Sequence, residues 1–382
     1  MRLQGIKEDR LILLITIALV AFGLVMVYSA SSVLALKKFG DSSYFLKRQA
    51  MWALLGFGAM LVAWKTDYAR FKYLALPLLV LTFILLVLVL VPGIGGGEVN
   101  GARRWIRLAG LSFQPSELAK PVLLATVAAS LAKRGDRLTD FAHGLGPYLA
   151  LMGTFIFIIA LEPDLGTAAA LGAAVVCVLF FAGARPVHLV ALGLLAAPVL
   201  YMQLFRVGFR RGRLMAYLDP WSDPLGTGFQ IIQSFLAFGG GGLTGRGLGE
   251  GRQKLLFLPE PHSDFIFSVI GEELGFIAAL GVVLVFCVLV FLGIRLALRC
   301  EDEFGRYLAF GLTVLIGIES LINMGVATGL FPNKGMPLPF ISAGGSALFV
   351  SLLSVGMLLS ISRAGQGYGG RGAGVAVPGA SH

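Results

Sequence analysis

The chain has 382 residues, of which 57% are hydrophobic and 14% are charged, and its formal net charge is +10. Soluble domains carry about 25% charged residues, so this composition excludes an ordinary soluble enzyme and indicates a membrane protein. The apolar residues stand in blocks of about 20, the length of a helix that crosses a hydrocarbon layer of about 30 Å. Because water is absent from that layer, each block must satisfy its own backbone hydrogen bonds, which predicts an all-α integral membrane protein.

Ten apolar blocks predict about ten transmembrane helices in one polytopic domain over residues 1–364. The first block follows Arg2, Lys7 and Arg10 but is too long for the apolar core of a signal peptide, so we expect an uncleaved first span. The eighth block is too long for one upright span, so its first turns should project above the lipid or line a cavity. Residues 365–382 are rich in Gly and predict a disordered tail. The predicted spans are 11–34, 49–66, 72–92, 116–133, 145–161, 165–183, 186–206, 265–297, 305–330 and 341–362.

The orientation depends on Lys and Arg, which are enriched in cytoplasmic loops. Ten spans place both termini on one side, and the basic residues divide almost evenly between the two sides. The basic residues on the side opposite the termini concentrate in residues 93–115 and 206–263. The second of these segments is a long loop, and long loops translocate largely regardless of charge. We therefore predict cytoplasmic termini. The outer arginines then indicate an anionic ligand, such as a lipid pyrophosphate, or contact with anionic membrane lipids. A basic charge that is split between two membrane faces argues against nucleic acid as a partner.

The first unusual polar segment spans residues 100–120. Its apolar residues, including Trp105, alternate with arginines such as Arg104, which is typical of a half-buried interfacial segment. Glu117 and Lys120 are three residues apart, so they share a helix face at or below the membrane interface. They form either a structural ion pair or the wall of a cavity that handles phosphate or a sugar.

A large outer loop, of about residues 207–263, is predicted between the seventh and eighth spans. Its basic first part ends at Arg213, and Asp219–Pro224 carries two turn signals. Apolar residues then recur at helical spacing over residues 229–236. This pattern predicts a short amphipathic helix, which lies either on the membrane surface or against the bundle.

Acidic residues gather where the eighth span begins. Glu260, His262 and Asp264 stand together, and Glu272 follows about 12 Å further along the helix on roughly the same face. Acids that enter a span in this way mark a functional lumen more often than a scaffold. The alternative is that Ser263 or Asp264 simply caps the helix. We expect His262 to be a hydrogen-bonding partner rather than a metal ligand, because no second His lies nearby.

The segment that enters the tenth span is rich in Pro, Gly and Ser. Lys334 is the only basic residue of its loop, and the hydroxyls of Ser342 and Ser346 can point into a cavity. The small residues equally permit close helix packing. In the ninth span, Glu319 and Asn323 are four residues apart and are again polar at membrane depth.

These segments resemble the SEDS family (shape, elongation, division and sporulation) over nearly the whole chain. The resemblance implies a peptidoglycan glycosyltransferase that uses lipid II, with the family's essential acid at Asp264. It also implies a single-span class B penicillin-binding protein as partner. Gln230 favours the division branch, and hence other divisome proteins and the septum of the bacterial inner membrane. Four residues depart from the family pattern: Glu162, Glu319, Asn333 and Ala343. The matching motifs are Gly101–Lys120, Asp164–Thr167, Asp219–Pro224, Lys254–Gly275 and Pro337–Ser346.

The resemblance further implies an inverting reaction, because the donor linkage of lipid II is α and the polymer is β-1,4. One in-line displacement needs a base for the acceptor hydroxyl, which we expect to be Asp264. The supporting residues are then Glu260, His262 and Glu272. The residues expected to bind the substrate and its pyrophosphate are Arg104, Trp105, Glu117, Lys120, Arg213, Lys334, Ser342 and Ser346.

Two points stay open at this level. Mg²⁺ is a candidate for bridging the phosphates, although the sequence has no dedicated metal motif and no organic cofactor is expected. A lipid II flippase and a non-catalytic division scaffold are the alternatives to an enzyme. An acid at the outer rim favours the enzyme, since flipping deprotonates no hydroxyl.

Overall fold

The computed structural model describes residues 8–91, 103–108, 111–134, 138, 140–205, 208–255 and 258–371. Two short strands, β1 (Ile106–Leu108) and β2 (Leu111–Phe113), pair antiparallel with Arg107 opposite Ser112. The α-helices in these ranges are α1 (Glu8–Phe39), α2 (Tyr44–Lys65), α3 (Tyr68–Leu90), α4 (Pro115–Arg134), α5 (Gly146–Leu161), α6 (Leu165–Phe181), α7 (Pro186–Phe205), α8 (Gly208–Leu218), α9 (Phe229–Gly241), α10 (Ile266–Arg299), α11 (Glu303–Ala327) and α12 (Gly345–Arg371).

Each of the ten predicted spans coincides with one helix, namely α1 to α7 and α10 to α12. Within the described residues, six helices are clearly long and apolar enough to cross a membrane. Two helices, α8 and α9, do not correspond to a predicted span and lie in the predicted outer loop between the seventh and eighth spans. The prediction of an all-α, multi-span membrane protein is therefore confirmed. The amphipathic helix expected at residues 229–236 is α9, whereas α8 and the β1–β2 hairpin were not predicted.

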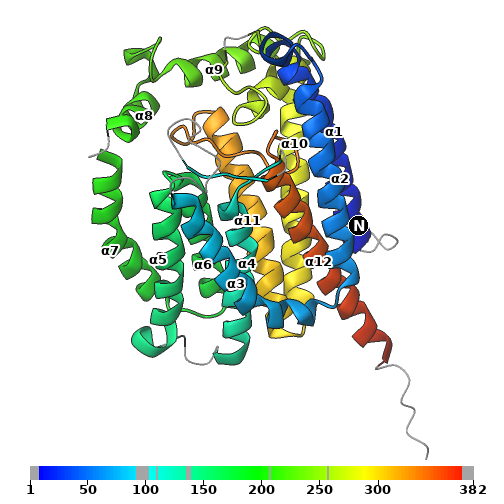
Figure 1. Ribbon diagram of the computed structural model, residues 1–382, viewed down its shortest axis with the longest axis vertical. Coiled ribbons are helices and arrows are strands. Elements are labelled where there is room, and N and C mark those ends of the chain that lie inside the picture. The colour runs from blue at the N-terminus through cyan, green and yellow to red at the C-terminus, as the bar shows by residue number, and fades with distance from the viewer. Residues whose placement is uncertain are drawn as a thin grey trace, which may run out of the picture.

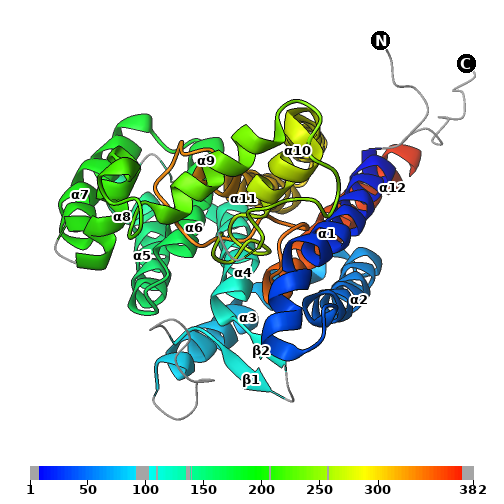
Figure 2. The ribbon, with the colours of Figure 1, turned by 90° about the horizontal axis from the view of Figure 1, so that it is seen from above.

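The spans alternate in direction, so the bundle has two distinct ends (Figure 1). At one end, which we call the terminal end, the Glu8 carboxylate lies 2.8 Å from Arg295 and 2.6 Å from Arg299. There too, Arg363 of α12 donates a hydrogen bond to the carbonyl of Lys65. The opposite end, which we call the loop end, carries α8, α9 and the hairpin. Seen from above, α4, α6 and α11 lie centrally, while α7, α8 and the hairpin lie at the periphery (Figure 2).

Aspartates begin several helices. The side chain of Asp67 accepts a hydrogen bond from Ala69 N at the start of α3, and Asp302 accepts one from Gly305 N at the start of α11. Asp164 does the same for α6 through Thr167 N. Such caps satisfy amides that have no partner within the helix. At α6 the cap also places a carboxylate at the loop end, beside the candidate site.

Small residues let the helices of the bundle approach closely. A Cβ added at Gly56 of α2 would lie 2.6 Å from the Leu352 side chain of α12, and one at Gly356 would lie 2.5 Å from the Met60 carbonyl. Small residues at helix interfaces give this kind of backbone approach in membranes. These contacts fix α12 against α2, and α12 follows directly after the loop that carries Lys334.

Helix α10 is interrupted at Gly275, whose φ is 80°. A Cβ there would lie 2.3 Å from the backbone nitrogen of Gly245, so only glycine allows the outer loop to approach so closely. The break divides the long eighth block, which the sequence indicated was too long for one upright span. The part of α10 before Gly275 belongs to the loop end.

Some sequence predictions reach beyond the described residues. Helix α12 continues to Arg371, into the predicted Gly-rich tail, and the rest of that tail, 372–382, lies outside the described residues. Gly101, which begins the first family motif, and Arg206 of the outer loop also lie outside them.

Candidate functional site

Asp264 lies just before α10 at the loop end and is half-buried. Its backbone carbonyl accepts a hydrogen bond of 3.0 Å from the Asn323 side chain of α11. The preceding residue, Ser263, is held through its carbonyl by the Ser342 hydroxyl at 2.5 Å. Phe265 occupies the N-cap position without a side-chain cap, so the alternative that Ser263 or Asp264 caps the helix is wrong. The segment is held by α11 and by the loop before α12, which leaves the Asp264 carboxylate for another role.

The electrostatic surroundings of Asp264 suit a general base. Burial, followed by the negative charge of Glu260, raises the pKa of Asp264 from 3.8 to about 6. A hydrogen bond from Ser263 and the charges of Arg213 and Arg104 oppose this rise in pKa. A carboxylate with this pKa is ionised at neutral pH and is more basic than an ordinary Asp, as general-base catalysis requires.

Three basic residues lie at the same end of the bundle, and two of them, Arg104 and Arg213, act on the charge of this carboxylate. Arg104 is oriented by the turn between α5 and α6, to whose Glu162 and Pro163 carbonyls it donates hydrogen bonds of 2.8 and 2.6 Å. Arg213 of α8 is half-buried, and burial lowers its pKa while Asp264 raises it. Lys334 is half-buried in the loop before α12, and burial lowers its pKa while Asp164 raises it. These three cations come from distant parts of the sequence, and all of them lie at the loop end.

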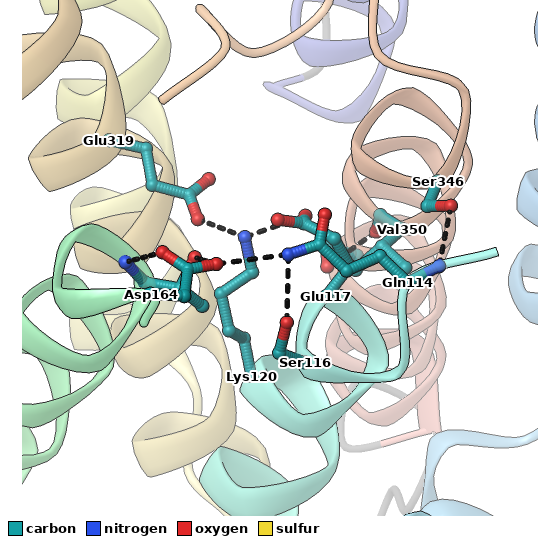
Figure 3. A network of polar contacts seen from close by, with 10 residues as sticks. Gln114, Ser116, Glu117, Lys120, Asp164, Glu319, Ser346 and Val350 are labelled. Carbon is teal, nitrogen blue, oxygen red and sulfur yellow. Dashed lines mark hydrogen bonds and ion pairs between the residues drawn. The ribbon is translucent and has the colours of Figure 1, made fainter. Parts of the chain in front are cut away.

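Lys120 belongs to a different cluster, which is buried between α4 and α11 (Figure 3). Its ammonium group lies 2.7 Å from the Glu117 carboxylate and is also bonded to Glu319 of α11. The three side chains, which we call the Lys120 cluster, are only 5–8% exposed. The structure thus supports the structural ion pair, widened by Glu319. It does not support Glu117 and Lys120 as direct ligands of a pyrophosphate, because their charges are already paired.

The Lys120 cluster adjoins a hydrogen-bonded network at the start of α4 (Figure 3). The side-chain amide of Gln114 donates to Ser116 at 2.9 Å and to Asp164 at 3.0 Å. The backbone amide of Gln114 donates to the Ser346 hydroxyl at 3.0 Å, and that hydroxyl donates to the Ser112 carbonyl. Ser346 therefore joins α12 to the hairpin rather than facing a substrate.

Ser342 also serves the protein's own structure. Its hydroxyl accepts a hydrogen bond from the backbone amide of Leu338 at 2.8 Å and donates to the Ser263 carbonyl. The next residue, Ala343, donates its amide to the His262 carbonyl at 2.8 Å. The predicted substrate contact of Ser342 is replaced by a role in holding the segment that carries Asp264.

Glu272 does not face Asp264, contrary to the expectation from its spacing. Its carboxylate is buried and accepts hydrogen bonds from the backbone amides of Arg252 and Gln253 in the outer loop. Its neighbour Glu273 forms a buried ion pair of 2.7 Å with Lys254. The two acids of α10 therefore anchor the outer loop on the bundle.

The remaining predicted residues have lesser roles in the geometry. The His262 ring packs on Phe45, with centroids 4.2 Å apart, and burial lowers the pKa of His262 to about 4. His262 is therefore neutral at pH 7, and its contact of 3.7 Å with the exposed Glu260 is not an ion pair there. Trp105 is half-buried beside Arg104 in the chain.

Two residues of the site were missed as functional residues by sequence reasoning. Asn323 was recognised only as a polar residue at membrane depth, yet it binds the Asp264 carbonyl. Gly335 gave no signal at all. A Cβ added there would lie 2.7 Å from a carboxylate oxygen of Asp264.

Comparison with known proteins shows the family of the chain. The FtsW/RodA/SpoVE family model, described as cell cycle protein, matches residues 9–366. The chain belongs to this family. It is 52% identical over 356 residues to a probable peptidoglycan glycosyltransferase FtsW of Geobacter sulfurreducens, covering 93% of this chain and 95% of that protein. It is 45% identical to stage V sporulation protein E of Bacillus subtilis, covering 94% and 97%.

Solved structures show the same fold. One of them is a chain of a solved structure described as the structural coordination of polymerization and crosslinking by a peptidoglycan synthase complex. It superposes with a TM-score of 0.75 at 33% identity, covering 93% of this chain and 97% of that chain. The rod shape determining protein RodA of Thermus thermophilus superposes with a TM-score of 0.66 at 29% identity, covering 92% and 95%. The family expectation from the sequence is confirmed.

Proposed function

We propose that Asp264 is the general base with which this peptidoglycan glycosyltransferase polymerises lipid II into β-1,4 glycan strands. The observation that carries the proposal is the setting of one carboxylate. Asp264 is half-buried at the loop end, has a pKa raised to about 6, and is subject to the positive charges of Arg213 and Arg104. A base and an anion-binding group are the two components that the reaction needs.

The reaction is one inverting displacement. Asp264 accepts the proton of the acceptor sugar's 4-hydroxyl as that oxygen forms a bond to the anomeric carbon of the donor. The bond from this carbon to the pyrophosphate oxygen breaks, and the electron pair leaves with the lipid pyrophosphate. General-base help contributes about 10²–10⁴-fold to such a rate. Arg104, Arg213 and Lys334 stabilise the charge of the departing group.

A divalent cation fits this site only together with substrate. The described residues contain no group of three His, Cys, Asp or Glu side chains placed to hold a metal. Mg²⁺, if used, would therefore be held mainly by the two phosphates, where it would supply further neutralisation of charge. The roles of Asp264 and of the basic residues are the same in either case.

The loop end faces the outside of the inner membrane in this proposal, and both termini are cytoplasmic. The terminal end supports this orientation, because it carries Lys65, Arg295, Arg299 and Arg363 and cytoplasmic loops are enriched in basic residues. Lipid II is then bound at the outer surface. A class B penicillin-binding protein and other divisome proteins are the partners we propose at the septum.

The test is polymerisation of labelled lipid II by the purified protein, with and without its transpeptidase partner and Mg²⁺. We expect long glycan chains from the unchanged protein and none from Asp264→Asn. Glu260→Gln, which changes a neighbouring exposed acid, should retain polymerisation. Undiminished activity of Asp264→Asn would remove Asp264 as the base, and lipid translocation in vesicles without polymer would favour a flippase.

A further inference from the structure

One side-chain amide joins the two loops that form the site. The Asn323 amide nitrogen donates hydrogen bonds to the Asp264 carbonyl at 3.0 Å and to the Met336 carbonyl at 2.6 Å. Asn323 is 1% exposed and belongs to α11, so it is fixed by a buried helix. Two carbonyl oxygens facing one group require a donor of two hydrogens, and a side-chain NH₂ has two. An isosteric carboxylate at this position has none.

The second carbonyl belongs to the loop that faces Asp264. Met336 follows Gly335, where a Cβ would lie only 2.7 Å from the nearer Asp264 carboxylate oxygen and 3.6 Å from the other. A separation below 3.0 Å forces one of the two groups to shift. The backbone of Gly335 is itself exposed, so this side of the carboxylate is where the site opens to solvent.

We propose that Asn323 is a positioning residue that holds the Asp264 segment against the Lys334–Met336 loop, with Gly335 leaving the space in which the Asp264 carboxylate rests. This inference rests on the proposed role of Asp264 as the base. Asn323 touches no substrate and acts through Asp264.

The two bonds have a functional consequence because they set a distance between opposite charges. Lys334 is adjacent to Gly335, so the loop that Asn323 secures also carries one of the cations proposed for the pyrophosphate. The amide therefore fixes the base relative to the leaving-group site. Misplacing a reacting group by about 1 Å can cost roughly 10²-fold in rate.

The first test compares Asn323→Asp with Ser320→Ala. Ser320 lies on the same helix, is equally buried, and donates its hydroxyl only to the carbonyl of Ile316 in its own helix. We expect Asn323→Asp to lower kcat by roughly 10²-fold, with KM for lipid II within about threefold because no substrate contact is lost. Ser320→Ala should retain kcat. Asn323→Gln keeps both donors and should recover part of the lost kcat.

The second test approaches Asp264 from outside the core, so that it does not depend on folding of an altered helix. Gly335→Ala should displace the carboxylate away from the exposed side of the site and lower kcat by about tenfold or more. The acid limb of the pH profile should move to higher pH, since the added methyl group and deeper burial raise the pKa of Asp264. Gly344→Ala is the matched control, because a Cβ there meets its nearest neighbour at an ordinary 3.4 Å.

The outcomes separate this inference from the proposed function. An active Asp264→Asn variant would overturn the role of the base itself. If Asp264→Asn is inactive while Asn323→Asp and Gly335→Ala keep full kcat and an unchanged pH profile, only the positioning role is wrong. Adding Asn323→Asp to Asp264→Asn should cause no further loss of residual activity, whereas an additional tenfold loss would show that Asn323 acts independently of Asp264.

Discussion

The Lys120 cluster and the Asp264 segment place ionisable groups in the same bundle, and both are contacted by α11. Glu319 of α11 pairs with Lys120, and Asn323, one turn later, binds the Asp264 carbonyl. In the Lys120 cluster every charge has a partner of opposite sign in direct contact. Asp264, by contrast, forms no salt bridge with any other described residue, and the arginines act on it only from a greater distance.

This difference indicates which charges are available to a substrate. A buried ion that is fully paired has its charge neutralised locally, and separating it from its partners would leave an uncompensated charge. A carboxylate that is held through its backbone, as Asp264 is, keeps its side-chain oxygens for a proton. The sequence alone places Glu117 and Lys120 within an apolar block and Asp264 at the start of another, and it cannot separate these two cases.

The largest effect that tests this comparison is expected for Lys120→Met. The substitution leaves Glu117 and Glu319 buried without their cation, and removing one partner of a buried pair costs about 3–5 kcal/mol. We expect a lower unfolding midpoint in detergent, whereas Asp264→Asn should leave the midpoint nearly unchanged. Adding Glu117→Gln and Glu319→Gln to Lys120→Met should restore much of the stability. Equal destabilisation by Lys120→Met and Asp264→Asn would break the distinction.

Arg104→Ala should instead reduce activity at little cost in stability. Removing a preorganised cation from the departing group is expected to lower kcat/KM by about 10²-fold. Arg107→Ala is the control, because Arg107 is exposed on the same hairpin. Steady-state polymerisation by the two variants checks the prediction. A similar loss from both would mean that the positive charge of this segment in general, and not the position of Arg104, is what matters.

The pH dependence of kcat/KM tests the state of Asp264 in the free enzyme. The folded pKa of about 6 lies above the ordinary 3.8, and the base acts in its ionised form, so activity should fall as pH decreases through 6. The decrease should approach tenfold per pH unit below that value. His262, with a pKa of about 4, is neutral on both sides of the limb. Glu260→Gln removes a charge that raises the pKa of Asp264, so the limb should move to lower pH.

The sequence was sufficient for the spans because each apolar block has the length of the hydrocarbon layer. It missed α8, which is short and carries three arginines in its first half. It also missed the three-residue strands of the hairpin, which are too short to show a periodic pattern. Charged side chains of the site were recognisable because charge is rare in such blocks. The pairing of Glu117 with Lys120 was also recognisable from their spacing, but partners distant in the chain were not, since Lys120 and Glu319 are 199 residues apart.

Gly335 shows a different limit of sequence reasoning. Its contribution is the absence of a side chain next to Asp264. The chain contains 51 glycines, and the residues around Gly335 in the sequence do not distinguish it from the others. Glu272 shows the converse case. Its spacing from Asp264 placed both on one helix face, but the chain is not yet helical at Asp264, and the carboxylate of Glu272 turns to the amides of the outer loop.

The smallest expected effect is that of Glu319→Gln, which tests whether the Lys120 cluster is held by charge count or by contact. Two carboxylates share one ammonium group, so removing one negative charge leaves a neutral pair and an amide oxygen that still accepts a hydrogen bond from Lys120. We therefore expect a change in unfolding free energy of less than about 1 kcal/mol, since a hydrogen bond contributes about that much on balance. Thermal unfolding beside Lys120→Met measures the difference directly. A loss as large as that of Lys120→Met would show that the cluster needs both carboxylates ionised, and that charge count rather than contact holds it together.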